Sequence, residues 1–267
     1  MEIKRLSPSP QLKKFVKCYY FIENPKDQLI HDVYFADGCV EAVFSVGWDF
    51  YKDDKKEDWA KVIGQIIKPR QLKIQGKGRS FGIWFHPHTF SCFTGIPMFE
   101  LNDRVLPWDV FFPNSFADFI GNCIHDSDLV GLVKGVDEFL LTKLSSYRAR
   151  PVDAVVDSAI GYLYNNKGRS NLSHLAASLK VSERYLQRAF VSRIGVSQKH
   201  FIRIMRFQQV LQNLGQDDLA NLTTVAYTND FYDQSHFIRE FKSFTGFVPS
   251  AFEVGNLPIN QHFLSVD

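Results

Sequence analysis

Residues 171–195, NLSHLAASLKVSERYLQRAFVSRIG, hold two short amphipathic segments on either side of a tight turn. Apolar side chains in each segment recur with the period of a helix, which gives each helix one buried face. They are Leu172, Leu175, Ala176 and Leu179 in the first segment, and Leu186, Ala189, Phe190 and Ile194 in the second. Ser182 is suited to cap the second helix, because its hydroxyl can accept a backbone N–H, and Gly195 is suited to end it. The stretch therefore predicts a helix-turn-helix unit.

The opposite face of the second helix carries Arg184, Gln187 and Arg188. An Arg side chain can donate two hydrogen bonds to guanine, Gln can pair with adenine, and both can also hold phosphate. Long polar side chains near the N-terminus of such a helix are what base contact in the DNA major groove requires. An ordinary solvated helix face is the alternative interpretation.

The distribution of charge favours the DNA interpretation. Residues 167–209 hold nine basic residues and one acid, Glu183, for a net charge of +8, whereas the whole chain carries +2. A concentrated positive patch is typical of phosphate binding. The basic residues are Lys167, Arg169, Lys180, Arg184, Arg188, Arg193, Lys199, Arg203 and Arg206.

A second unit follows a connecting helix. Residues 197–214 predict that helix, which is long enough to hold two recognition helices about one DNA turn, ~34 Å, apart. Beyond it we expect a short helix from Leu222, a longer helix capped by Asp233, and a final helix whose first turn holds Pro249. The exposed residues of the longer helix are Gln234, Ser235, His236 and Arg239.

Two such units, with R-x-x-Q-R-x-F in the first and F-x-D-Q-S-H-F-x-R-x-F…G-x-x-P in the second, resemble the DNA-binding domain of AraC/XylS-family transcription regulators. The resemblance covers residues 152–254. It implies an all-α double helix-turn-helix domain of about seven helices, with double-stranded promoter DNA as its partner. It also implies base or phosphate contacts at Arg184, Gln187, Arg188, Gln234, Ser235, His236 and Arg239.

The second unit departs from the family pattern. Asp230 stands where Gly is usual, and Val248 stands where a Thr usually caps the next helix. Residues 210–267 hold two basic and seven acidic residues, a net charge of −5. We therefore expect the first unit to supply most of the DNA affinity, and the second either to read bases loosely or to contact RNA polymerase instead.

Residues 1–125 predict a mainly β domain, an antiparallel barrel or sandwich with one or two helices. Short apolar runs alternate there with Gly, Pro, Asp and Lys clusters. The region resembles the cupin-like sensor half of many AraC-type regulators, and ADGCVEAVFSVG and FGIWFHPHTFSCFTGIPMFEL resemble an uncharacterised N-terminal domain of some members. The expected strands are residues 29–35, 40–46, 60–67, 72–75, 81–85 and 105–112.

Aromatic residues are abundant in the chain, which has 25 Phe. Core filling explains most of them. The alternative is that some line an apolar pocket for a small-molecule effector, whose identity the resemblance does not imply. The candidates for such a pocket are Trp48, Trp84, Phe85 and Trp108.

Catalytic and metal sites have weak support. His86 and His88 could share one side of a strand as metal ligands, but no Asp or Glu follows between residues 89 and 99, and Pro87 interrupts pairing. His125 and Asp126 have no nucleophile nearby, so we expect them in a loop that enters the next helix. We therefore expect no metal, no cofactor and no catalytic residues, and a metal cupin enzyme fused to a DNA-binding domain is the remote alternative.

Residues 126–147 predict a helix whose wide apolar stripe can pack partly on the β domain and partly on a second copy of the chain. A hinge is expected just before Pro151. The predicted division is a β-rich sensor domain at 1–125, a helix and linker at 126–150, and the DNA-binding domain at 151–267.

No run of about 18 apolar residues and no signal-peptide core is present, which predicts a cytoplasmic protein with no membrane partner. The sequence as a whole predicts a DNA-binding transcription regulator and not an enzyme. Its N-terminal domain would sense a small ligand, form a homodimer, or do both. The alternative is an N-terminal domain that only dimerises or contacts RNA polymerase.

Overall fold

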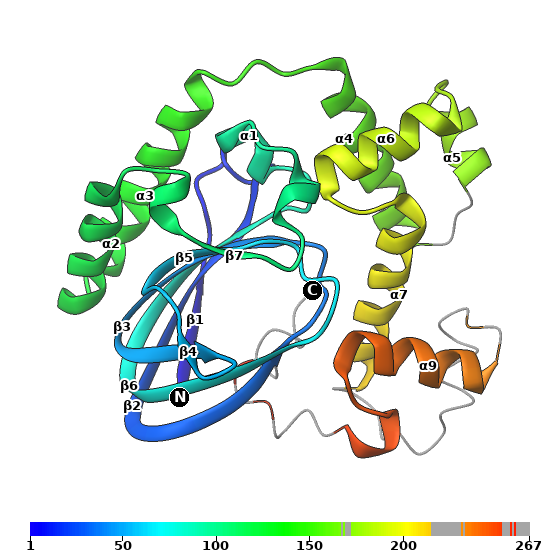
Figure 1. The fold of residues 1–267 in the computed structure, drawn as a ribbon. Coiled ribbons are helices and arrows are strands. Elements are labelled where there is room, and N and C mark those ends of the chain that lie inside the picture. Colours follow the sequence, from blue (N-terminus) through cyan, green and yellow to red (C-terminus); the bar gives the residue numbers. More distant parts are fainter. Residues whose placement is uncertain are drawn as a thin grey trace.

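The computed structural model describes residues 1–166, 168, 172–214, 231, 233–252, 257 and 259. A β-sheet with three helices against it forms the N-terminal part, and a set of helices forms the C-terminal part (Figure 1). The predicted fold, a mainly antiparallel β domain followed by an all-α domain, is confirmed.

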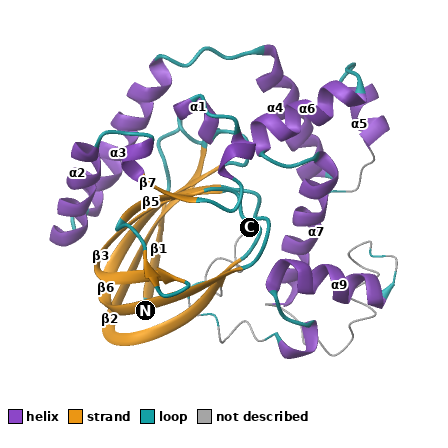
Figure 2. Ribbon diagram, viewed as in Figure 1, coloured by secondary structure: helices purple, strands orange, loops and turns teal. Residues whose placement is uncertain are grey.

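One antiparallel sheet of seven strands makes up the β domain, in the order β1-β2-β6-β3-β5-β7, with β4 paired to β3 beside this path. Figure 2 shows the long strands curving over along their length. The strands are β1 (Glu2–Leu6), β2 (Val16–Tyr34), β3 (Val40–Lys52), β4 (Lys55–Lys56), β5 (Ala60–Ile63), β6 (Arg70–Phe85) and β7 (Val105–Pro107).

The bend in the sheet depends on glycines at the irregular points of the long strands. The pairing of β3 with β6 shifts between Val46 and Trp48, and Gly47 at that point has φ +86°. A Cβ on the facing Gly78 would lie 2.4 Å from the Val46 carbonyl oxygen, so only glycine fits there. For this reason the two strands predicted at 72–75 and 81–85 are parts of one strand, β6, and the glycines between them bend it without ending it.

Other predicted strand boundaries were also wrong. The run expected at 29–35 is the second half of the long strand β2, whose first half was not predicted. The strand expected at 105–112 stops at Pro107, because Trp108 turns into a 3-10 helix (Trp108–Val110) and buries its ring in the main core.

Three helices pack on the sheet: α1 (Phe90–Thr94), α2 (Asn114–Asp126) and α3 (Leu129–Ser145). A 3-10 helix at Met98–Leu101 follows α1 in the chain. The helix predicted at 126–147 corresponds to α3. Helix α2 was not predicted, and His125 with Asp126 ends that helix instead of lying in an entry loop. Ser127, in the left-handed region at φ +59°, separates the two helices.

The apolar stripe of α3 faces its own domain. Leu132, Val136 and Leu140 are fully buried in the main core, together with residues of the sheet and of α2. Val130, by contrast, is 82% exposed. Most of the stripe is therefore used within the chain.

The helical domain contains α4 (Pro151–Asn165), α5 (Leu172–Ser178), α6 (Glu183–Ile194), α7 (Gln198–Leu214) and α9 (Gln234–Thr245). The helix predicted from Leu222 and the departure at Asp230 lie outside the described residues, as do Lys167 and Arg169. Of the predicted final helix, the described part is one 3-10 turn, Pro249–Ala251. None of the helices described is both long and apolar enough to cross a membrane.

A shared core joins the two parts of the chain. Val33, Phe35 and Ala36, at the end of β2, pack among buried residues of α7 and α9. The ring centroid of Phe35 lies 6.2 Å from that of Phe207 and 5.8 Å from that of Phe252. The second helix-turn-helix unit is thus built partly on the β domain.

Candidate nucleic-acid interface

Helix α6 begins and ends where its capping residues predict. The Ser182 Oγ accepts a hydrogen bond from the Tyr185 backbone N–H at 3.2 Å, and Gly195 ends the helix at φ +96°. Leu186 and Phe190 are fully buried in the core of the first unit. Their positions fix which face of α6 points away from the protein.

That outward face carries the three predicted contact residues of the first unit. Arg184, Gln187 and Arg188 are all exposed. Within the described part of the chain, neither arginine forms an ion pair with an acid, so both charges are available to an external anion. Lys180, in the turn before α6, and Lys199, near the start of α7, are exposed as well. This group of four cations and one amide is the candidate DNA surface.

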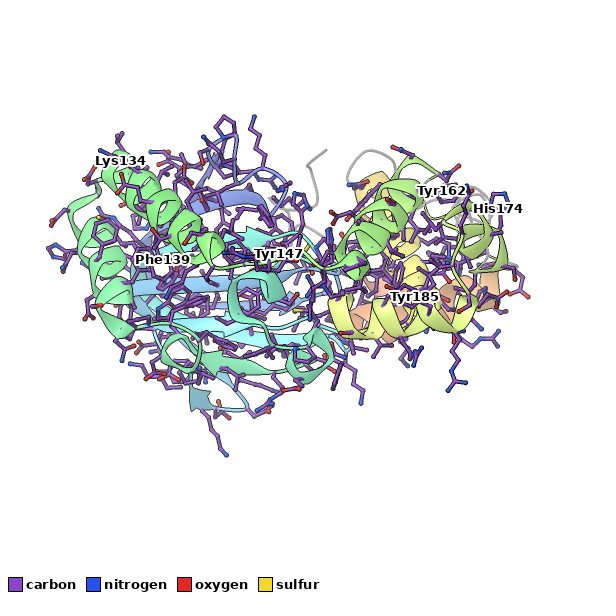
Figure 3. The ribbon with its side chains drawn as sticks, turned by 90° about the horizontal axis from the view of Figure 1, so that it is seen from above. Lys134, Phe139, Tyr147, Tyr162, His174 and Tyr185 are labelled. Atoms are coloured by element: carbon purple, nitrogen blue, oxygen red, sulfur yellow. The ribbon has the colours of Figure 1, made fainter. Side chains whose placement is uncertain are left out.

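Arg193 lies on the same helix but has a different role. It is 2% exposed, and its guanidinium forms an ion pair with Asp153 of α4 at 2.5 Å. It also donates to the Tyr147 hydroxyl at 3.1 Å and to the Cys92 Sγ at 3.5 Å. Figure 3 shows Tyr147 between the β domain and the helical domain. Arg193 therefore joins the first unit to the β domain and is not part of a phosphate-binding patch.

Arg203 and Arg206 of α7 share one acid inside the protein. Both form ion pairs with Glu240 of α9, at 3.3 Å and 3.8 Å, and Glu240 is only 5% exposed. The predicted charge of +8 over residues 167–209 is therefore an overestimate of the surface charge. The acids that pair with Arg193, Arg203 and Arg206 come from α4 and α9, outside the segment whose charges were counted.

Helix α9 presents its predicted contact residues unequally. Asp233 caps the helix, with its Oδ1 accepting the His236 backbone N–H at 2.7 Å. Gln234, Ser235 and Arg239 are exposed. His236 is half-buried, and its Nε2 lies 3.2 Å from a Glu240 oxygen, so its imidazole already has a partner within the helix. Helices α6 and α9 lie near opposite ends of α7 (Figure 1).

The four aromatic residues predicted to line one pocket do not meet. Phe85 and Trp108 are buried in the main core between the sheet and its helices. Trp48 belongs to a separate cluster and donates its indole N–H to the Ser80 Oγ at 2.7 Å. Only Trp84 lines the cavity described next. The prediction was wrong because successive residues of a strand, such as Trp84 and Phe85, point to opposite faces of the sheet.

A small cavity of about 70 Å³ lies on the sheet face opposite the main core, next to α7. Asp37, Cys39, Glu41 and Val43 line it as alternate residues of one extended segment. Gln208 of α7 also borders it and donates to the Ala36 carbonyl at 2.7 Å. No clear sequence signal marked this wall, because residues 37–43, DGCVEAV, do not alternate strictly between polar and apolar side chains, and the Asp37–Gly38 pair alone indicated only a turn.

The two histidines considered as metal ligands have separate partners. His88 Nε2 lies 2.5 Å from the Asp157 Oδ1, and His86 Nε2 lies 3.1 Å from the Lys13 carbonyl oxygen. Burial lowers the pKa of His86. Across the described residues, no group of three or more His, Cys, Asp or Glu side chains is arranged to hold a metal ion. His88 instead contributes a contact between the β domain and α4.

Comparison with solved structures finds similar chains of the same overall length. ToxT from Vibrio cholerae O395 is 12% identical with a TM-score of 0.47, over 92% of this chain and 98% of that chain. ToxT from Vibrio cholerae strain SCE256 with bound unsaturated fatty acid is 14% identical with a TM-score of 0.46, over 87% and 92%. The AraC-like transcriptional activator CuxR is 14% identical with a TM-score of 0.28, over 78% and 86%.

No curated protein matches the chain. Two family models match parts of it. Residues 4–107 match a family described as a domain of unknown function, and residues 175–253 match one described as a helix-turn-helix domain. Residues 175–253 therefore match a helix-turn-helix domain of the AraC type.

Proposed function

We propose that this protein is a sequence-specific transcription regulator that acts in the cytoplasm, binds promoter DNA through α6 and α9, and has no catalytic activity. The observation that carries the proposal is the exposed face of α6. Arg184, Gln187 and Arg188 share that face, and no acid among the described residues is ion-paired with either arginine. Such side chains near a helix N-terminus suit contact with base edges and phosphates.

The two units are proposed to contribute unequally. The first unit supplies most of the affinity, because its cations are exposed, whereas Arg203 and Arg206 are ion-paired with Glu240 behind the second unit. Gln234, Ser235 and Arg239 of α9 are proposed to add base contacts. RNA polymerase as a partner of the second unit stays a prediction.

We further propose that the N-terminal domain controls the DNA-binding domain in response to a small molecule. The cavity next to α7 supports this, because its wall includes residues of both domains, among them Phe35 and Gln208. A ligand that binds one arrangement of the two domains better than another would shift the population toward it. Formation of a homodimer through α3 stays a prediction, since most of its apolar stripe is buried within the chain.

The experiment that tests DNA binding is fluorescence anisotropy with a labelled duplex from upstream of the protein's own gene. It is run at two salt concentrations, with unlabelled random DNA as competitor. We expect competitor-resistant binding that weakens steeply with salt. The double variant R184A/R188A should weaken binding and flatten its salt dependence. Unchanged affinity and an unchanged salt slope in that variant would refute the assignment of the first unit.

A further inference from the structure

The cavity next to α7 has an unusual lining. Two carboxyl groups, those of Asp37 and Glu41, border it, and no Lys, Arg or His does so among the described residues. The rest of the wall is aliphatic and aromatic, including Ile22, Ile63 and Leu72. The cavity is therefore apolar with two carboxyl groups at one end, which disfavours a carboxylate or phosphate ligand on electrostatic grounds.

Neither carboxyl group forms an ion pair with a cation in the part of the chain that the structure describes. Asp37 accepts hydrogen bonds from the Trp84 indole N–H at 2.7 Å and from the Cys39 backbone N–H at 2.9 Å. Glu41 accepts one from the Tyr20 hydroxyl at 3.0 Å through Oε2, and its other oxygen has no donor in the described structure. Neither forms an ion pair with any described residue. Placing two such acids side by side is costly unless a proton or a cation lies between them.

Nearby cations are directed elsewhere. Lys17 Nζ lies 3.8 Å from the centre of the Trp84 ring and forms no ion pair with either acid. Arg70, on β6, is paired with Glu57. Lys17 lowers the pKa of both Asp37 and Glu41 from a distance, but no described cation is in direct contact with either carboxyl group.

We propose that this cavity binds a small organic cation, in particular a primary alkylammonium ion, between the carboxyl groups of Asp37 and Glu41. The ammonium group would donate to the free Glu41 oxygen and to Asp37, and the alkyl chain would lie against the aliphatic wall. The aromatic rings of Tyr20 and Tyr34 also border the cavity, and aromatic faces attract ammonium groups. A metal ion fits less well, because these acids and Cys39 are not arranged as a metal site.

The position of the cavity gives the ligand a route to the DNA-binding domain. Gln208 and Phe35 both border the cavity, and Phe35 packs on Phe207 and Phe252 in the core of the second unit. Occupancy would therefore change the packing between β2 and α7. This consequence rests on the proposed regulatory function, whereas the binding itself does not.

The test uses the full-length protein and isothermal titration calorimetry without DNA. The probe is n-butylammonium. Two controls of the same chain length, n-butyrate and butan-1-ol, test an anion and an uncharged molecule. Decanoate tests an anion with a longer chain, and Mg²⁺ tests an inorganic cation. The expected result is that only n-butylammonium binds with one site per chain. Equal or tighter binding of an anion or the alcohol, binding of Mg²⁺ alone, or no heat from n-butylammonium would each overturn the proposal.

Variants locate the site. E41Q keeps an acceptor for Tyr20 and should weaken n-butylammonium binding at least tenfold, whereas E138Q, at an exposed position on α3, should leave it unchanged. D37N is the second variant if E41Q alters the circular dichroism of the free protein. Equal affinity in both cavity variants and E138Q would also overturn the proposal. Promoter anisotropy with and without n-butylammonium then tests the regulatory consequence separately, so that failure of regulation is distinguished from failure of binding.

Discussion

The two helix-turn-helix units use their charged residues in different ways. On α6, Arg184 and Arg188 are exposed and have no acidic partner among the described residues, and only Arg193 is turned inward. Around α9, Glu240 holds two arginines of α7 and its own helix neighbour His236. The first unit therefore has exposed arginines that can bind an external anion, whereas the charged residues around α9 form ion pairs within the protein. Similar sequence motifs can thus have different electrostatic surfaces.

The largest expected effect separates two arginines of one helix. R193A should lower the free energy of unfolding by about 3–5 kcal/mol, because it leaves the carboxylate of Asp153 buried without its cation. R188A, five residues earlier on the exposed face, should change it by less than about 0.5 kcal/mol. Urea unfolding followed by circular dichroism measures both. Equal effects of the two substitutions would mean that Arg193 is not the internal contact that the geometry indicates.

The next prediction concerns the cluster in the second unit. E240A should destabilise the protein by about 2–4 kcal/mol, since Arg203 and Arg206 lose their shared buried carboxylate. The expected loss is smaller than for R193A because these arginines are partly reached by water. E183A, in the exposed first turn of α6, is the matched control and should cost less than about 1 kcal/mol. If E240A lowered the free energy of unfolding no more than E183A, the ion pairs of Glu240 would not stabilise the second unit as proposed.

The third prediction compares how much each helix-turn-helix unit contributes to DNA binding. R184A/R188A should weaken promoter binding by about 10–100-fold and lower the salt slope by about 2, as expected when two phosphate-binding cations are removed. Q234A/R239A should weaken it by less than about tenfold and lower the slope by about 1. Fluorescence anisotropy at several salt concentrations measures both quantities. A larger loss in the α9 variant would reverse the proposed order of the units.

The smallest expected effect tests the cavity that borders the second unit. Burial, and then the neighbouring Asp37, raise the pKa of Glu41 to about 8, whereas the Tyr20 hydrogen bond and Lys17 act in the opposite direction. The folded protein therefore keeps a proton that the unfolded chain releases above its ordinary pKa of 4.5. Stability from this site is present at low pH and is lost as pH rises toward about 8.

The E41Q variant should remove this pH dependence. Relative to E41Q, the unmodified protein should lose only about 1 kcal/mol between pH 5 and pH 8, because water partly reaches the half-buried Glu41 side chain and weakens the effect. Urea unfolding at the two pH values gives the difference. A parallel pH profile for the two proteins would show that Glu41 titrates as an ordinary exposed carboxyl group.

Local sequence signals predicted the helical domain well. The caps Ser182, Ser197 and Asp233 each accept a backbone N–H in the first turn of the helix that they were expected to start. These predictions succeeded because a cap and an amphipathic period act over four to seven residues. Strand boundaries were predicted less well, because Gly76 and Gly78 bend β6 where the same residues would elsewhere end a strand.

The charge count failed for a related reason. Arg193, Arg203 and Arg206 are close in sequence to the exposed arginines, and nothing local distinguishes them. Their partners Asp153 and Glu240 come from α4 and α9, which only folding brings near. Likewise, Trp48, Trp84, Phe85 and Trp108 were grouped by type. Strand alternation sends Trp84 and Phe85 to opposite faces of the sheet, and Trp108 lies in a 3-10 helix that buries its ring in the main core.

The sequence by itself determined the order of the domains, the helix-turn-helix pattern and the exposed face of α6, since helical period and capping are local properties of the chain. Only the tertiary structure decided which cations remain exposed and which form ion pairs. The reason is that an ion pair depends on the distance between two charges in space, and the partner acids are far away in the sequence. It also decided that two acids should border a cavity next to α7. That juxtaposition depends on the bend of the sheet and on the packing of Phe35 into the helical domain.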